Sequence, residues 1–303
     1  SNTSALPITG LAETTGRPAN VVGLHFFSPV ERMPLVEVIR GRQTGDTALA
    51  HALDFVAQLK KTPILVNDSR GFFTSRFIGA FINEGVTMVK EGINPALIEN
   101  AARMTGYPVG ALTISDEIGL DLAYKGAQQQ AQDLGADNRP GASVEVIATM
   151  VATHGRHGRK NGKGFYEYAA DGGKRLWPGL DDLWPRRPAS EQPDVREVQH
   201  RMLYAQLADA ARCIADGVLT DPADGDIGGC FGVGFPIYLG GPFAAMDTIG
   251  IGAVVAECDR LAARYDAGRF AIPALLREMA AEGKTFYGRN RVVPPARRTE
   301  PVA

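Results

Sequence analysis

Two short apolar runs, each carrying one ionisable residue, are the most constraining feature of this sequence. They lie in residues 21–40 and read VVGLHF and PLVEVI, and the loop SPVERM with Pro29 separates them. Runs rich in Val, Ile, Leu and Phe are typical of buried strands. His25 lies in the first run and Glu37 in the second. Since ionisable groups in buried strands are normally paired, the pattern predicts neighbouring strands that place an imidazole beside a carboxylate.

Two interpretations of this pair follow from the residue types alone. An imidazole held by a carboxylate has the arrangement of a general base with an orienting acid. The same contact could instead be a structural salt bridge that satisfies a core histidine. The residue types leave both open.

Composition excludes several function classes. A net charge of −2 and a pI near 6.2 give no support for nucleic-acid binding, and no apolar run reaches the roughly 20 residues of a membrane span. The start, SNTSALPITG, lacks the basic region of a signal peptide. The three widely spaced cysteines Cys213, Cys230 and Cys258 fit a reducing cytoplasm and argue against a disulfide framework or a metal site.

The first 70 residues predict an α/β arrangement in the order strand end, helix, strand, strand, helix, strand. The second helix is expected over residues 46–59 and the last strand over 62–68. This order resembles the second half of a doubly wound dinucleotide-binding domain. The sequence contains no G-x-G-x-x-G turn, the usual pyrophosphate anchor. We therefore expect a piece of a longer protein that begins inside the nucleotide domain and is inactive alone.

The rest of the chain predicts helices in two similar units. A helix is expected over residues 72–91, and a proline-rich linker over 178–194. The segment REVQHRMLYAQLADAARCIADGVLTDPADG parallels RFIGAFINEGVTMVKEGINPALIEN, and each continues to an aromatic residue followed by proline. The predicted fold is thus α/β followed by all-α, with a partial nucleotide domain at 1–70 and duplicated helical domains at 71–186 and 187–303.

GLHFFSPVERMPLVEVI resembles the signature of the L-3-hydroxyacyl-CoA dehydrogenases, and GFFTSR resembles their G-F-[IF]-x-N-R. The resemblance implies NAD as cofactor, His25 as the base that takes the 3-hydroxyl proton, and Glu37 as its carboxylate partner. It also implies that Ser4 lies near the substrate hydroxyl and the nicotinamide, although Ser4 could equally be a helix cap. Ser28 and Ser75 stand where the family usually has asparagine, and they are expected to contact substrate.

The two helical units are similar to those of the α-subunit of the multifunctional fatty-acid β-oxidation complex. That resemblance implies an acyl-CoA substrate, a thiolase partner subunit and an enoyl-CoA hydratase domain outside this chain. It leaves open a homodimer through the helical domains. Two alternatives remain: an assembly module with a relic site, favoured by the missing glycine turn and the two serines, and a 3-hydroxybutyryl-CoA dehydrogenase.

Overall fold

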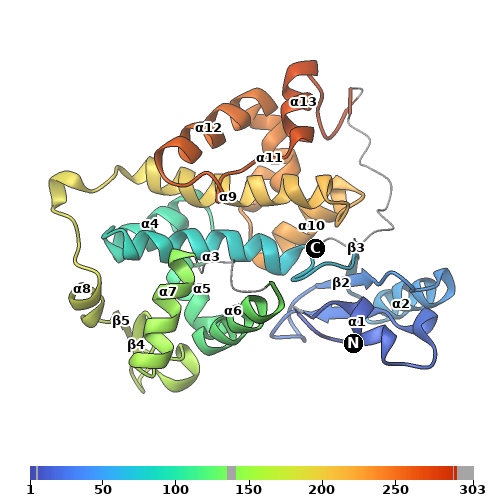
Figure 1. Cartoon of the computed structure of the whole chain (residues 1–303), viewed down its shortest axis with the longest axis horizontal. Coiled ribbons are helices and arrows are strands. Elements are labelled where there is room, and N and C mark those ends of the chain that lie inside the picture. The colour runs from blue at the N-terminus through green and yellow to red at the C-terminus, as the bar shows by residue number, and fades with distance from the viewer. Residues whose placement is uncertain (5, 135–140, 289, 292–303) are drawn as a thin grey trace. The chain divides into compact units, whose positions relative to one another are not determined.

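The computed structural model describes residues 1–4, 6–134, 141–288 and 290–291 (Figure 1). The chain divides into two compact units. The first comprises residues 1–79 together with the chain from Tyr204 onward, and the second comprises residues 80–203. Two long helices contribute residues to both units: α3 (Thr74–Lys90) and α9 (Val195–Ala215). An α/β part is thus followed by a chain made mostly of helices, as the sequence predicts.

The first unit begins with a small mixed sheet. Strand β1 pairs antiparallel with β2, and β2 pairs parallel with β3. The elements of this part are α1 (Ile8–Glu13), the 3-10 turn η1 (Pro18–Asn20), β1 (Gly23–Phe26), β2 (Leu35–Arg40), α2 (Asp46–Gln58) and β3 (Thr62–Asn67). The expected helix over 46–59 and strand over 62–68 are confirmed to within one residue.

The central strand β2 is buried on both faces, which explains its nearly continuous apolar sequence. Val36 and Val38 form a core with Val56 and other residues of α2. Because successive side chains of a strand point to opposite faces, Glu37 points away from α2. The alternation of β2 therefore places the carboxylate on the face where α3 begins.

Helix α10 packs on the sheet through glycine. A Cβ added to Gly228 would lie 2.7 Å from Cδ1 of Ile64 on β3, and one added to Gly232 would lie 2.6 Å from Cδ2 of Leu35 on β2. Such distances leave no room for a side chain, so these glycines let the helix approach the strands. The C-terminal elements are α10 (Pro222–Val233), η5 (Ile237–Leu239), α11 (Pro242–Ile249), α12 (Ile251–Arg264) and α13 (Ala274–Glu282).

The second unit is helical apart from a two-stranded ribbon. Its helix α4 begins after Asn94, whose side chain accepts a hydrogen bond from the Ala96 N–H, and it ends at Gly106 with φ of 102°. The remaining elements are α4 (Pro95–Thr105), α5 (Ala111–Ile118), α6 (Leu120–Leu134), α7 (Ala142–Ala148), the π-turn η2 (Thr149–Thr153), η3 (Arg159–Asn161), β4 (Tyr166–Tyr168), β5 (Lys174–Leu176), α8 (Gly179–Leu183) and η4 (Ala189–Glu191).

Three expectations from the sequence need correction. Residues 1–4 form no regular strand, although the Leu24 N–H donates to the Ser1 carbonyl at 2.8 Å. The predicted helix over 72–91 begins at Thr74, because Gly71 and Phe72 have positive φ values of 72° and 47°. The expected linker over 178–194 contains α8 and η4. Among the described residues, none of the helices has the length and apolar character needed to cross a membrane.

Candidate active site

His25 and Glu37 face each other across the antiparallel strands β1 and β2. They are register partners, and His25 Nδ1 lies 2.9 Å from Glu37 Oε2. The histidine side chain is 11% exposed and the glutamate side chain is fully buried. The imidazole also contacts the Phe27 ring, with centroids 4.6 Å apart. The predicted imidazole–carboxylate pair is therefore present, with the histidine on its solvent side.

The start of α3 holds the Glu37 carboxylate on the other side. Oε1 accepts the N–H groups of Phe73 at 2.9 Å and Thr74 at 3.1 Å, and Oε2 accepts the Thr74 hydroxyl at 2.5 Å. An anion suits this place because the first N–H groups of a helix have no partner within the helix. Glu37 therefore caps α3 and orients His25 at the same time.

This environment determines which nitrogen of His25 carries the proton. An ionised carboxylate can only accept hydrogen bonds, and every recorded partner of Glu37 is a donor or can be one. Nδ1 must therefore carry the hydrogen that faces Oε2. In the neutral imidazole this leaves a lone pair on Nε2. The arrangement can accept a proton at Nε2 and stabilise the resulting cation through Glu37.

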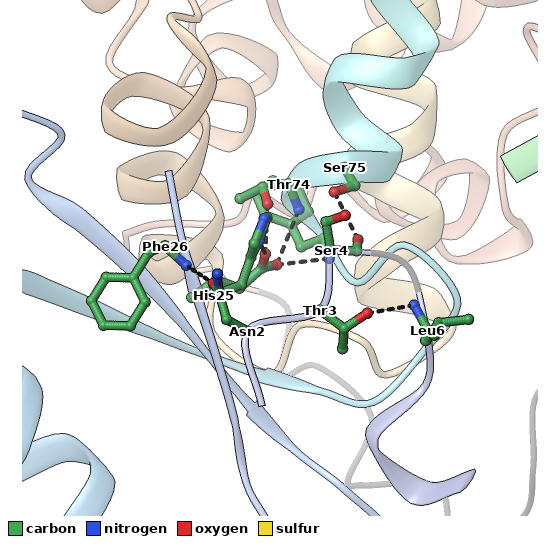
Figure 2. A network of polar contacts seen from close by, with 10 residues as sticks. Asn2, Thr3, Ser4, Leu6, His25, Phe26, Thr74 and Ser75 are labelled. Atoms are coloured by element: carbon green, nitrogen blue, oxygen red, sulfur yellow. Dashed lines mark hydrogen bonds and ion pairs between the residues drawn. The ribbon is translucent and has the colours of Figure 1, made fainter. Parts of the chain in front are cut away.

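Ser4 lies next to the start of α3. The Ser75 hydroxyl donates to the Ser4 carbonyl oxygen at 3.0 Å, and Figure 2 shows the two residues together near His25 and Thr74. The interpretation of Ser4 as a helix cap is wrong, because α1 begins four residues later. There the Asp68 carboxylate accepts the N–H groups of Ile8 at 2.9 Å and Thr9 at 2.7 Å. Ser4 is exposed, so a contact with substrate or nicotinamide stays a prediction.

The other expected substrate residues differ in their surroundings. Ser28 is exposed in the loop after β1, where it forms a cis peptide bond with Pro29. Ser75 is half-buried, and its hydroxyl binds the backbone of Ser4. The structure thus brings Ser4 and Ser75 together, while the role of all three serines in substrate binding stays a prediction.

Sequence reasoning missed three residues of this site. Thr74 binds Glu37, Asp68 caps α1, and the Asn2 side chain accepts the Phe26 N–H at 2.9 Å, which ties the segment before Ser4 to β1 (Figure 2). Thr74 could have been suspected, because it lies inside the GFFTSR motif beside Ser75. Asp68 and Asn2 carry no signal beyond their polarity.

The residues of this site suit one end of a dinucleotide. The partly exposed imidazole of His25 and the exposed Ser4 can meet a substrate hydroxyl and a nicotinamide ring. The sequence contains no G-x-G-x-x-G turn, so no residue of this chain can be assigned to the pyrophosphate through that motif.

The mixed sheet with its histidine–carboxylate pair, and the helices that follow it, match the models of one dehydrogenase family. The model of the 3-hydroxyacyl-CoA dehydrogenase NAD-binding domain matches residues 1–69, and that of the 3-hydroxyacyl-CoA dehydrogenase C-terminal domain matches residues 71–168. The chain belongs to the 3-hydroxyacyl-CoA dehydrogenase family.

Similar proteins also include subunits of a complex. The fatty acid oxidation complex subunit alpha of Shewanella amazonensis is 42% identical over 289 residues, which is 95% of this chain and 40% of that protein. The same subunit of Shewanella sp. strain MR-4 is 39% identical over 292 residues, with the same coverage. The chain thus spans about 40% of the length of these curated relatives.

Solved structures share the fold. The 3-hydroxybutyryl-CoA dehydrogenase of Escherichia coli K12 has a TM-score of 0.73 at 21% identity and covers 93% of this chain and 74% of its own. The dehydrogenase part of multifunctional enzyme 1 from C. elegans has a TM-score of 0.63 at 24% identity, covering 91% and 63%. The (S)-3-hydroxybutyryl-CoA dehydrogenase of Ralstonia eutropha is 37% identical with a TM-score of 0.51, covering 56% and 59%.

Proposed function

We propose that this chain carries the dehydrogenase site of a fatty-acid β-oxidation protein, which oxidises (S)-3-hydroxyacyl-CoA to 3-oxoacyl-CoA with NAD. The observation that carries the proposal is the contact of 2.9 Å between His25 Nδ1 and Glu37 Oε2. With Nδ1 as the donor, Nε2 is the nitrogen that faces away from Glu37 and can act as a base. Membership in the 3-hydroxyacyl-CoA dehydrogenase family supports the same reaction.

In the proposed reaction, the residues of this chain transfer one proton from the substrate to His25. Nε2 of His25 takes the proton of the 3-hydroxyl group as the C3–H bond breaks and the C3–O bond becomes a carbonyl. The Glu37 carboxylate then stabilises the imidazolium through Nδ1–H. Ser4 and Ser28 bind the oxygen whose charge changes, and Ser75 lies near the thioester end of the substrate. NAD, when bound, accepts the hydride from C3.

The test uses the full-length protein that contains this chain, with NADH formation from 3-hydroxyacyl-CoA as the measurement. His25→Ala should lower the rate by about 10²- to 10⁴-fold, the usual contribution of a general base. The matched control is His51→Ala, because His51 is exposed on α2. It should keep the rate of the unchanged protein. Near-normal turnover in the His25→Ala protein would contradict the proposal.

Two alternatives have distinct outcomes in this assay. The 37% identical relative is named a 3-hydroxybutyryl-CoA dehydrogenase, so a substrate series from four carbons upward would reveal a preference for that short chain. An assembly module with a relic site would show no NADH formation with any chain length. The piece 1–303 alone is expected to be inactive and to bind NAD weakly.

We further propose that the helical part is duplicated, with a nucleotide part at 1–70 and helical domains at 71–186 and 187–303. Equivalent hydrogen bonds in the two units support this. In one unit Glu99 accepts the N–H groups of Leu112 and Thr113 and the Tyr166 hydroxyl. In the other, a second carboxylate accepts an equivalent set: Asp226 binds the N–H groups of Phe243 and Ala244 and the Tyr287 hydroxyl.

Arg76 on α3 and Arg201 on α9 repeat this correspondence. In the first unit, Arg76 NH2 lies 3.2 Å from Asp209 Oδ1 and NH1 lies 3.6 Å from Asp216 Oδ2. In the second unit, Arg201 lies 2.6 Å from both Glu84 and Glu91. Each arginine thus binds two acids spaced seven residues apart in the sequence, the second of which lies one residue past the end of its helix, as expected of two copies of one sequence.

We also propose a thiolase subunit as partner and the cytoplasm as location. The relatives are named as subunits of an oxidation complex, and the free thiols of Cys213, Cys230 and Cys258 suit a reducing compartment. Purification of the tagged full-length protein from its own cells should recover a thiolase in fixed proportion. Recovery of a homodimer alone would favour pairing through the helical domains.

A further inference from the structure

Thr74 is the first residue of α3 and the middle residue of the triplet Phe73–Thr74–Ser75. Its hydroxyl donates to Glu37 Oε2 at 2.5 Å, and the same oxygen lies 2.9 Å from His25 Nδ1. Thr74 is fully buried, so water does not compete for this hydrogen bond. One carboxylate oxygen therefore serves two donors, one from the candidate base and one from a neutral side chain.

We propose that Thr74 is a positioning residue that sets the basicity of His25 through Glu37. This inference rests on the proposed function, in which His25 is the base. A hydroxyl that donates to Oε2 already stabilises part of the carboxylate charge, so the same oxygen attracts the imidazolium less strongly. The Thr74 hydroxyl thus limits how strongly Glu37 stabilises the imidazolium.

The side chains that contact His25 make Glu37 the main charge acting on the imidazole. Within the described residues, the rings recorded against the imidazole are those of Phe27 and Phe72, at centroid distances of 4.6 and 6.2 Å, and neither carries a charge. A change at Thr74 therefore acts on His25 through the Glu37 carboxylate.

The test is the pH profile of kcat/KM of the full-length protein with 3-hydroxyacyl-CoA and NAD. Thr74→Val removes the hydroxyl and keeps the shape, so Oε2 binds the imidazolium more strongly. The acid limb of the profile should move up by about half a pH unit, the effect of losing one hydrogen bond of typical net strength. Thr74→Ala should move the acid limb by the same amount. If one of the two variants does not fold, the other provides the test. Thr74→Ser keeps the donor and should keep the limb in place.

The outcomes separate this inference from the proposed function. The role of Thr74 is overturned if the acid limb of the pH profile stays in place in both Thr74→Val and Thr74→Ala. A fall in kcat or in the unfolding midpoint would not rescue it, because a threonine with a merely structural role would change only those two quantities. If His25→Ala keeps the normal rate, the proposed function itself fails. If His25→Ala loses the rate and Thr74→Val leaves the limb unmoved, only the inference on Thr74 fails.

Discussion

Arg201 Nε lies 2.6 Å from Glu84 Oε1, and both side chains are 1% exposed. The same guanidinium reaches Glu91 with NH1 at 2.6 Å and NH2 at 2.9 Å. A buried charge is tolerated only where partners replace its water. This contact therefore fixes the second half of α3 to the first turns of α9 within the second unit.

Arg201→Met should destabilise the protein by about 3–5 kcal/mol, because it removes the guanidinium that neutralises a buried carboxylate. Arg277→Met is the matched control, since Arg277 and its partner Asp259 are about half exposed, at 51% and 48%, and should cost less than about 1 kcal/mol. Urea denaturation of the two variants gives the free energies of unfolding. Equal losses would mean that burial adds nothing to the Arg201 contact.

Glu37→Gln should lower both the dehydrogenase rate and the stability. The amide presents an NH₂ group to donors that now face a carboxylate, and buried donors without an acceptor cost about 1–3 kcal/mol. Glu99→Gln is the control, because Glu99 caps α5 as Glu37 caps α3, with the Leu112 N–H at 2.8 Å from Oε1. It should lose similar stability and keep the rate. A rate loss of the same size in both variants would contradict a special role for Glu37.

Ser75→Ala should lower kcat/KM by about three- to tenfold, the effect of losing one hydrogen bond. The reason is that the Ser75 hydroxyl holds the Ser4 carbonyl at 3.0 Å and so positions the segment that carries Ser4. The free energy of unfolding should change by less than about 1 kcal/mol, since the contact is exposed. Ser75→Asn restores the residue usual in the family and is the comparison. An unchanged kcat/KM in Ser75→Ala would remove Ser75 from the site.

Asp226→Asn should change how stability depends on pH. Burial raises the pKa of the Asp226 carboxyl to about 6, against about 3.9 in the unfolded chain. Between these values the folded state holds a proton that the unfolded state has released, so the free energy of unfolding falls as pH rises and levels off above about pH 6. The asparagine variant should lack this slope. Denaturant unfolding at several pH values measures this slope, and Asp54→Asn is the control because Asp54 is exposed. An unchanged slope in Asp226→Asn would contradict the raised pKa of Asp226.

The sequence by itself determined which residues pair across the strands. His25 and Glu37 are the ionisable members of two apolar runs, and the β-branched residues around them favour strands. Asn94 and Pro95 likewise determine the start of α4 locally, because a cap and its helix lie within a few residues. The resemblance to the dehydrogenase family likewise rests on short motifs, those around His25 and Ser75.

The tertiary structure decided what those residues do. That Glu37 caps α3, that Asp68 rather than Ser4 caps α1, and that Ser75 binds the Ser4 backbone all depend on segments 36, 60 and 71 residues apart in the chain. Such contacts follow from the direction in which each strand and helix leaves the sheet, and spacing along the sequence does not encode that direction. The physical reason is that a buried donor takes whichever acceptor packing brings within reach.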